Sequence, residues 1–207
     1  MSGGYTAIKE GVYTLEIKRS EFLAYSFPVC DERDAAEKLA AVRKKHYDAR
    51  HVCYAYIADE QGLIARFSDD GEPSGTAGKP ILDVIKKSGL SKSLIAVVRY
   101  FGGILLGAGG LTRAYSDSAA GAVKTNGTIT YVQKNVLKAQ TDYSTYKKIS
   151  SAVKSLGEII GVEYSDGVTF RLACDDGDKS GRILTESANG KISVAREKDE
   201  YFATEEK

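Results

Sequence analysis

The segment from Val98 to Tyr115 constrains the fold of this chain more than any other, because a glycine-rich turn there follows a strand pattern and precedes a helix pattern. The run at 93–98 is almost wholly apolar, which indicates a strand buried on both faces. Apolar positions then recur at helical spacing from Leu111 to Val123. Between the two patterns lie glycines that permit positive φ or close backbone contact: Gly102, Gly103, Gly107, Gly109 and Gly110. We expect function to lie at this strand-to-helix connection.

Length and composition describe a soluble globular protein. The 207 residues suffice for one large domain or two small ones, each with its own core. Hydrophobic residues make up 43% of the chain and charged residues 28%, as in ordinary globular proteins. Every apolar run is shorter than the roughly 20 residues of a membrane-spanning helix, and charges interrupt the first 30 positions, unlike a signal peptide. We expect a cytoplasmic protein without a membrane partner.

The cysteines indicate neither a disulfide framework nor a zinc site. Cys30, Cys53 and Cys174 are odd in number, far apart and without C-x-x-C spacing. We therefore expect buried free thiols. No motif indicates a bound metal or another cofactor, so none is expected.

Net charge limits the kind of nucleic-acid surface that the chain can form. At +1 it excludes a strongly basic protein and leaves room only for a local patch, and no DNA specificity is expected. The best candidate for contact with a nucleic acid or a partner consists of Arg43, Lys44, Lys45 and Arg50, with His46 and His51 among them. The alternative interpretation is a solvated helix end, because cations are stabilised near helix C-termini.

Hydrophobic periodicity predicts β-β-α-β-β-α-β-α for the first part of the chain. Alternation predicts strands at 12–18 and 21–29, and Asp31 caps a helix over 32–46. Strands at 51–58 and 63–68 follow, and a loop at 68–80 leads into a helix that starts near Pro80 and ends at Gly89. The strand at 93–98 and the helix after the glycines complete this part.

The pattern resets at the Asn126-Gly127 turn, so the predicted domains are 1–133 and 134–207. The second domain reads as a strand at 135–142, a helix up to Leu156, strands at 160–164 and 168–174, a helix near 177–187 and a strand near 191–197. Asp166-Gly167 predicts a hairpin between the middle strands. This β-α-β-β-α-β order is that of a ferredoxin-like domain, and the whole chain is predicted to be α+β.

Two loops concentrate the polar residues, and both precede helices. The first loop carries Ser68, Asp69, Asp70, Glu72, Ser74 and Thr76, and the second carries Arg99 and Tyr100, the five glycines and Arg113. If the strand at 93–98 lies beside that at 63–68, both loops converge on one cleft. The carboxylates suit Mg²⁺ or acid–base chemistry, although Asp and Ser in a turn also form local backbone hydrogen bonds.

Each further candidate has a structural alternative. Gly107, Gly109 and Gly110 suggest amides that bind an anion, but their spacing is not G-x-G-x-x-G, and close strand–helix packing explains about half of these glycines without a ligand. Arg113 either binds that anion or pairs with Asp117. His51 is a candidate acid or base, and Cys53 shares its face, but either side chain can instead be structural.

Three long motifs resemble the YigZ/IMPACT family over essentially the whole chain. They are H-V-C-Y-A-Y at 51–56, S-D-D-G-E-P-S-G-T-A-G-K-P at 68–80 and R-Y-F-G-G-I-L-L-G-A-G-G-L-T-R-A-Y at 99–115. The K-R-S-E-F segment at 18–22 also resembles the start of the family pattern, with Glu21 where a basic residue is more common.

The resemblance implies an N-terminal domain of the ribosomal-protein/elongation-factor-G domain IV type, with a left-handed βαβ unit. It also implies a C-terminal domain similar to elongation factor G domain V. The first functional hypothesis is thus a non-catalytic regulator of translation that binds the ribosome, RNA or a translation-factor protein. The alternative is an enzyme for a small phosphorylated or carboxylated ligand, held by Gly107, Gly109, Gly110 and Arg113, with proton transfer by Asp69, Asp70 or His51. The oligomeric state stays open.

Overall fold

The computed structural model describes residues 3–204 and divides them into two units. The N-terminal unit is Tyr5–Thr130, and the C-terminal unit is Tyr131–Thr204 together with residues 3–4. The described residues form five helices and two sheets with antiparallel strand pairs. The predicted α+β class is therefore correct.

The sheet of the N-terminal unit contains strands β2 (Gly11–Ile17), β3 (Ser20–Pro28), β4 (His51–Ile57), β5 (Ala65–Ser68) and β6 (Ser93–Tyr100). Their order is β2-β3-β6-β4-β5, and each neighbouring pair is antiparallel. Strands β3 and β4 both pair with β6, so they run parallel to each other, and helix α1 (Glu32–Lys45) connects them. With helices α2 (Gly78–Lys87) and α3 (Gly107–Asn126), the predicted element order is observed.

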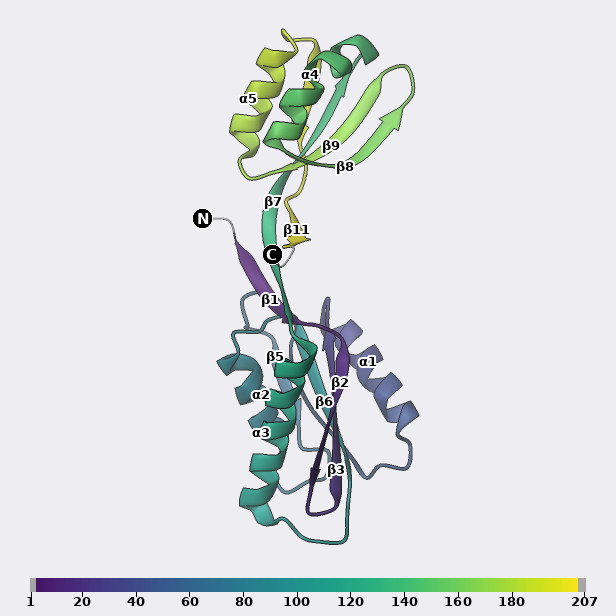
Figure 1. Cartoon of the computed structure of the whole chain (residues 1–207), viewed down its shortest axis with the longest axis vertical. Helices are drawn as coiled ribbons and strands as arrows, with labels where there is room; N and C mark the ends of the chain where they lie inside the picture. The colour runs from purple at the N-terminus through teal and green to yellow at the C-terminus, as the bar shows by residue number, and fades with distance from the viewer. Residues whose placement is uncertain (1–2, 205–207) are drawn as a thin grey trace. The chain divides into compact units, whose positions relative to one another are not determined.

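Helices cover both faces of this sheet, with α2 and α3 on one face and α1 on the other (Figure 1). Ile81 of α2, Tyr115 of α3 and Ile95 of β6 belong to the core on the first face. Val42 of α1 packs on the opposite face with Ala96. The continuous apolar run of β6 follows from this arrangement, because every side chain from 93 to 99 is buried against one layer or the other.

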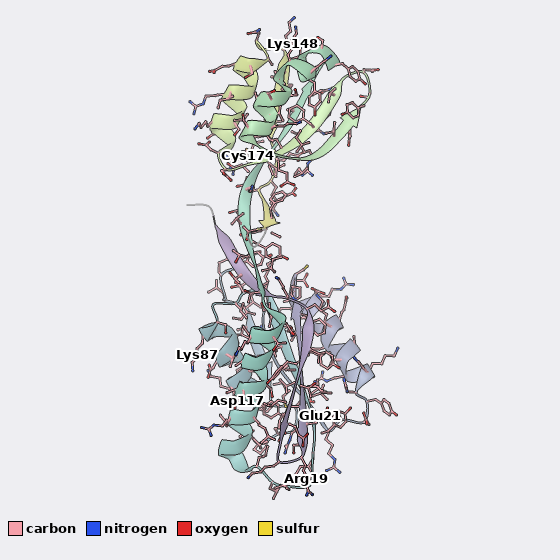
Figure 2. All side chains as sticks on the ribbon, in the orientation of Figure 1. Arg19, Glu21, Lys87, Asp117, Lys148 and Cys174 are labelled. Atoms are coloured by element: carbon pink, nitrogen blue, oxygen red, sulfur yellow. The ribbon has the colours of Figure 1, made fainter. Side chains whose placement is uncertain are left out.

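Local signals end the elements where the sequence indicates. The Asp31 side chain accepts a hydrogen bond from the Asp34 amide at 2.8 Å and so caps α1. Gly89 follows α2 with φ +65°, which favours glycine. Lys18 and Arg19 both have positive φ in the two-residue turn between β2 and β3, and Figure 2 shows Arg19 at its tip.

The C-terminal unit has the predicted β-α-β-β-α-β order. Its elements are β7 (Thr128–Thr141), which starts in the N-terminal unit, α4 (Tyr143–Leu156), β8 (Gly157–Tyr164), β9 (Val168–Cys174), α5 (Gly177–Ser187) and β10 (Ile192–Arg196). The strand order is β10-β7-β9-β8. Both helices pack against the sheet, where Ile149, Phe170 and Leu184 are fully or almost fully buried.

The structure adds two strands to the predicted elements and extends one strand and one helix. Strands β1 (Gly4–Ile8) and β11 (Glu200–Ala203) were not predicted, and β7 begins at Thr128 rather than at 135. These segments are short or weakly alternating, and their pairing along β7 supplies the hydrogen bonds that make them strands. Helix α3 begins at Gly107, so three of the five glycines lie in its first turn rather than in a loop. No helix within 3–204 is long and apolar enough to cross a membrane.

Candidate functional site

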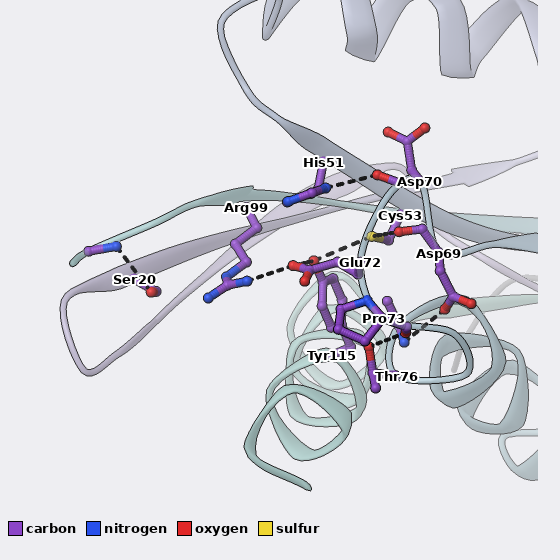
Figure 3. A network of polar contacts seen from close by, with 12 residues as sticks. Ser20, His51, Cys53, Asp69, Asp70, Glu72, Pro73, Thr76, Arg99 and Tyr115 are labelled. Carbon is purple, nitrogen blue, oxygen red and sulfur yellow. Dashed lines mark hydrogen bonds and ion pairs between the residues drawn. The ribbon is translucent and has the colours of Figure 1, made fainter. Parts of the chain in front are cut away.

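Glu72 joins the two polar loops. Its Oε1 accepts hydrogen bonds from Arg99 Nη1 at 2.7 Å and from the Tyr115 hydroxyl at 2.8 Å (Figure 3). The Arg99 and Glu72 side chains are only 8% and 4% exposed. The loop after β5 and the strand-to-helix connection after β6 therefore meet at one buried charge pair, in a medium where electrostatic interactions are strong.

The predicted reason for this convergence was wrong. Strand β6 does not lie beside β5, because β4 lies between them. The loop after β5 instead passes over the start of β4. There the Asp70 carboxylate accepts from the Val52 amide at 2.7 Å, and the Asp70 carbonyl lies 2.8 Å from His51 Nδ1.

Arg99 lies in a row of side chains that crosses the sheet. Phe22 of β3 and His51 of β4 are its direct partners on the two neighbouring strands, so the three side chains share a face. The Arg99 guanidinium carbon lies 5.5 Å from the ring centroid of Phe22 and 5.6 Å from that of Phe101. Its Nε is buried and has no hydrogen-bond partner among the described residues. Cation–π contacts thus flank a guanidinium whose N–H groups are only partly used.

Asp69 has a structural role in the loop after β5. Its carboxylate accepts hydrogen bonds from the amides of Gly75, Ala77 and Gly78 at 2.8, 3.0 and 2.8 Å, and thereby caps α2. Burial raises the pKa of this carboxyl, but the three amides outweigh that effect, so its pKa lies below the ordinary value. Asp69 is therefore an ionised cap at neutral pH.

His51 and Cys53 are held by the same loop. Because a carbonyl only accepts, His51 Nδ1 donates to Asp70, and its Nε2 is the nitrogen left for other partners. Cys53 Sγ lies 2.9 Å from the Asp69 carbonyl oxygen and 3.3 Å from the Tyr115 hydroxyl. Burial, ahead of nearby carboxylates, raises the pKa of the Cys53 thiol to about 12, and burial also raises the pKa of Tyr115. The thiol is protonated at neutral pH, which is the opposite of an activated nucleophile.

The remaining candidate ligand residues do not join the Glu72 cluster. The Ser68 hydroxyl accepts from the Asp70 amide at 3.1 Å, Thr76 donates to the Pro73 carbonyl at 2.6 Å, and Ser74 is exposed. Arg113 lies on the exposed side of α3, and no ion pair joins it to Asp117 among the described residues. Figure 2 shows Asp117 on the same helix.

The five glycines have different local surroundings. Gly102 is tightly packed: a Cβ there would lie 2.0 Å from the backbone of Arg19, and its amide donates to Ser20 Oγ at 3.1 Å. Gly103 and Gly107 need positive φ, and neither they nor Gly109 have a neighbour near the Cβ position. A Cβ at Gly110 would contact only the Leu106 side chain, at 3.1 Å. Close packing therefore explains Gly102, and backbone conformation explains two others.

The basic cluster lies at the end of α1 and in the connection to β4. Arg43 pairs with Asp70 Oδ1 at 3.1 Å and lies over the Tyr54 ring, 5.8 Å from its centroid. Lys45 lies over the Tyr25 ring at 5.0 Å, while Lys44 and Arg50 are exposed. Among the residues that the structure describes, no group of three or more acidic, histidine or cysteine side chains is arranged to hold a metal ion.

A chain of hydrogen bonds orders this connection. The Tyr100 hydroxyl donates to Asp48 Oδ1 at 3.0 Å, so it accepts from His46 Nδ1 at 2.9 Å. His46 Nε2 then accepts from the Tyr25 hydroxyl at 2.8 Å. Burial and the neighbouring Lys45 lower the pKa of His46, against the opposing effect of acidic neighbours. The neutral Nδ1–H tautomer is thus the one that completes the chain.

Acidification is expected to weaken the folded state through His46. Its pKa is lower in the folded protein than the unfolded value of about 6.5, so the unfolded chain binds more protons and stability falls as the pH drops through that value. The melting temperature of the wild type should fall between about pH 7.5 and pH 5.5, and that of His46→Gln should fall less. Equal slopes for the two proteins in thermal melts would contradict this role.

Sequence reasoning missed several residues of the site. Tyr115 was assigned to the helical core stripe, and nothing local indicated that its hydroxyl reaches Glu72. Phe22 and Ser20 belong to the K-R-S-E-F segment at 18–22, and that motif was the available signal for their contacts with Arg99 and Gly102. Phe101 lies two positions after Arg99, and its half-exposed ring lies beside the guanidinium.

Comparison with known proteins identifies the family. Residues 18–123 match the family model "Impact N-terminal domain". IMPACT family member YvyE of Bacillus subtilis is 34% identical over 198 residues, which cover 94% of this chain and 91% of the relative. IMPACT family member YigZ of Escherichia coli is 39% identical over 166 residues, covering 76% and 79%.

Two further comparisons extend this result. A solved crystal structure of an hypothetical protein matches with a TM-score of 0.63 and 31% identity, over 94% of this chain and 97% of that one. Protein IMPACT homolog of Dictyostelium discoideum is 39% identical over 94 residues, 44% of this chain and 27% of the relative. The motifs at 51–56, 68–80 and 99–115 that build the Glu72 cluster lie within the matched range. The chain belongs to the IMPACT family.

Proposed function

We propose that this protein is a cytoplasmic, translation-associated regulator that binds RNA of the ribosomal particle through the basic cluster at the end of α1. The observation that carries the proposal is the layering of cations on tyrosines there. Tyr25, Ala96 and Tyr54 form one row across β3, β6 and β4 on the face that α1 covers. Lys45 lies over Tyr25, and Arg43 lies over Tyr54.

This arrangement suits single-stranded RNA better than a duplex. Unpaired bases stack on aromatic and guanidinium planes, while lysine and arginine contact phosphates. The tyrosines are held by stacked neighbours, Tyr25 by Phe27 and Tyr54 by Tyr56, with ring centroids 6.4 and 6.1 Å apart, and so give the two cations above them fixed positions. Because the net charge is only +1, the affinity for RNA should be modest. Because lysine and arginine side chains contact the phosphates, this affinity should fall as the salt concentration rises.

The domain types belong to the same proposal. The N-terminal unit would be of the ribosomal-protein/elongation-factor-G domain IV type, and the parallel β3-α1-β4 connection with β6 between its strands supports this. That type has a left-handed crossover, against the usual hand. The C-terminal domain would be ferredoxin-like and similar to elongation factor G domain V, which the order β10-β7-β9-β8 supports. The domain boundary would lie near residue 133, within β7.

The enzymatic alternative has less support in the geometry. Of the residues proposed for proton transfer, Asp69 caps α2, Asp70 holds the Val52 amide and Arg43, and the His51 Nδ1 is bound to the Asp70 carbonyl. Both carboxylates thus stabilise the fold, and the Cys53 thiol, with a pKa of about 12, is not an activated nucleophile, so only the His51 Nε2 is left for acid–base chemistry. A non-catalytic binding role accounts for the same residues and does not require an activated acid, base or nucleophile.

Co-sedimentation with ribosomal particles tests the proposal. Lys44→Glu/Lys45→Glu should weaken binding by about tenfold or more at low salt and should reduce the salt slope of log K by about 2. Lys86→Glu/Lys87→Glu is a matched control: it makes the same charge change in the last turn of α2, where Figure 2 shows Lys87. Equal binding by both variants, or no binding of the wild type at any salt, would refute the proposal.

A further inference from the structure

A pocket of about 430 Å³ lies beside the Glu72 cluster, at the start of β4 and the end of β6. Its lining residues are Asp48, Arg50, His51, Arg99, Tyr100, Phe101 and Leu105. One part of the lining is cationic, another is aromatic and apolar, and one residue is a carboxylate. The pocket therefore suits a ligand with an anionic, an apolar and a hydrogen-bond-donating part better than a purely apolar one.

Arg99 provides the strongest reason to expect an anion. The residue is 92% buried, and Nη1 is the nitrogen that donates to Glu72. Nε has no acceptor among residues 3–204. A buried N–H without an acceptor costs free energy, and the Nε side of a guanidinium presents the donor fork that matches a phosphate. The ion pair with Glu72 holds this fork in place.

Two further groups favour the same ligand class. His51 uses Nδ1 for the Asp70 carbonyl, so Nε2 is the ring nitrogen available to a ligand in the pocket that His51 lines. Figure 3 shows this nitrogen pointing away from Asp70. Arg50 precedes His51 and is exposed. Together with Arg99 at the end of β6, these two residues at the start of β4 line the same pocket with hydrogen-bond donors.

The apolar side chains and the carboxylate of the lining indicate which chemical groups accompany the anion in the ligand. Phe101 is 52% exposed and Leu105 is 83% exposed, so both apolar side chains are accessible to a ligand in the pocket. The Asp48 carboxylate would repel a bare anion, but it can accept hydrogen bonds from hydroxyl groups. A ribonucleotide carries all three complements: a phosphate, ribose hydroxyls and a planar base.

We propose that this pocket binds a ribonucleotide. Its phosphate contacts Arg50, His51 and Arg99, its base packs on Phe101, and its ribose hydroxyls donate to Asp48. The inference deepens the proposed function and rests on it, because an RNA strand bound to the basic cluster would bring a ribonucleotide to this pocket. Arg50 belongs to both the basic cluster and the pocket lining. A free nucleotide supplies the same chemistry, so the test separates the two sources.

Isothermal titration calorimetry of the full chain at low salt is the test, with AMP, adenosine, inorganic phosphate and a short single-stranded oligoadenylate as probes. We expect AMP to bind about tenfold more tightly than adenosine or phosphate alone. Arg50→Ala should weaken AMP binding by about tenfold, and Phe101→Leu should weaken it while leaving phosphate binding unchanged. Lys87→Ala on α2 is the control that should change nothing.

The outcomes are distinct. Equal affinity for AMP and the oligoadenylate identifies a free nucleotide as the ligand, and binding of the oligoadenylate about 100-fold tighter identifies an RNA strand. No binding of either probe, phosphate binding as tight as that of AMP, or indifference to both Arg50→Ala and Phe101→Leu would overturn the inference. Retained, charge-dependent ribosome co-sedimentation alongside such a result would leave the proposed function standing and remove only the pocket.

Discussion

Glu72→Ala is expected to destabilise the protein by about 3–5 kcal/mol, because it leaves the charge of Arg99 buried without its partner. Arg99 is 8% exposed, and Glu72 Oε1 is the acceptor for both its Nη1 and the Tyr115 hydroxyl. Urea unfolding should show a lower midpoint with an unchanged slope. A loss below about 1 kcal/mol would contradict a buried, coupled pair.

Two further variants separate the lost charge pair from lost packing. Tyr115→Phe removes one hydrogen bond to the carboxylate and should cost about 1.5–3 kcal/mol. Glu72→Ala/Arg99→Met leaves no buried charge and should recover part of the loss of the single variant. If the free energy of unfolding of the double variant is lower than that of Glu72→Ala, the ion-pair explanation is wrong.

Gly102→Ala is expected to cost about 3 kcal/mol or more, because the new methyl group meets backbone rather than a flexible side chain. The ideal Cβ lies 2.0 Å from the carbonyl carbon and oxygen of Arg19 and 2.5 Å from the Ser20 nitrogen. The β2–β3 turn would have to move away, and the hydrogen bond from the Gly102 amide to Ser20 Oγ would be lost with it. Urea unfolding again measures the effect.

Gly109→Ala is the matched control from the same glycine-rich segment. Nothing lies within 4 Å of its Cβ position, and it occupies the first turn of α3. Alanine has the higher helix propensity, so this variant should be neutral or up to about 1 kcal/mol more stable than the wild type. A large loss at Gly109 would mean that the segment needs its glycines for a reason other than close packing.

Sequence reasoning predicted most of the elements, because each one depends on neighbours in the chain. Asp31 is the N-cap of α1 as expected, and the Asn126-Gly127 pair marks the end of α3. The strands along β7 that were missed depend instead on a distant pairing partner. For the same reason β4, rather than β5, proved to be the neighbour of β6.

The candidate site was predicted as two loops, and the structure assigned the individual roles. In sequence, Asp69, Asp70 and Glu72 are three similar acids in one turn-like loop. In the structure, the first caps α2, the second holds β4 and Arg43, and the third pairs with Arg99. The glycines mark the connection from β6 to α3, although three of them lie in the helix itself.

The sequence by itself determined the family, the order of helices and strands and the two loops that meet, since these rest on motifs and on periodicity along the chain. Only the tertiary structure decided which acid is buried, which N–H groups of Arg99 are left for another acceptor, and that a mixed cationic and aromatic pocket lies beside them. Glu72 reaches its partners across 27 and 43 positions of sequence. Burial and charge pairing over such separations depend on how the layers pack, and no local pattern contains that information.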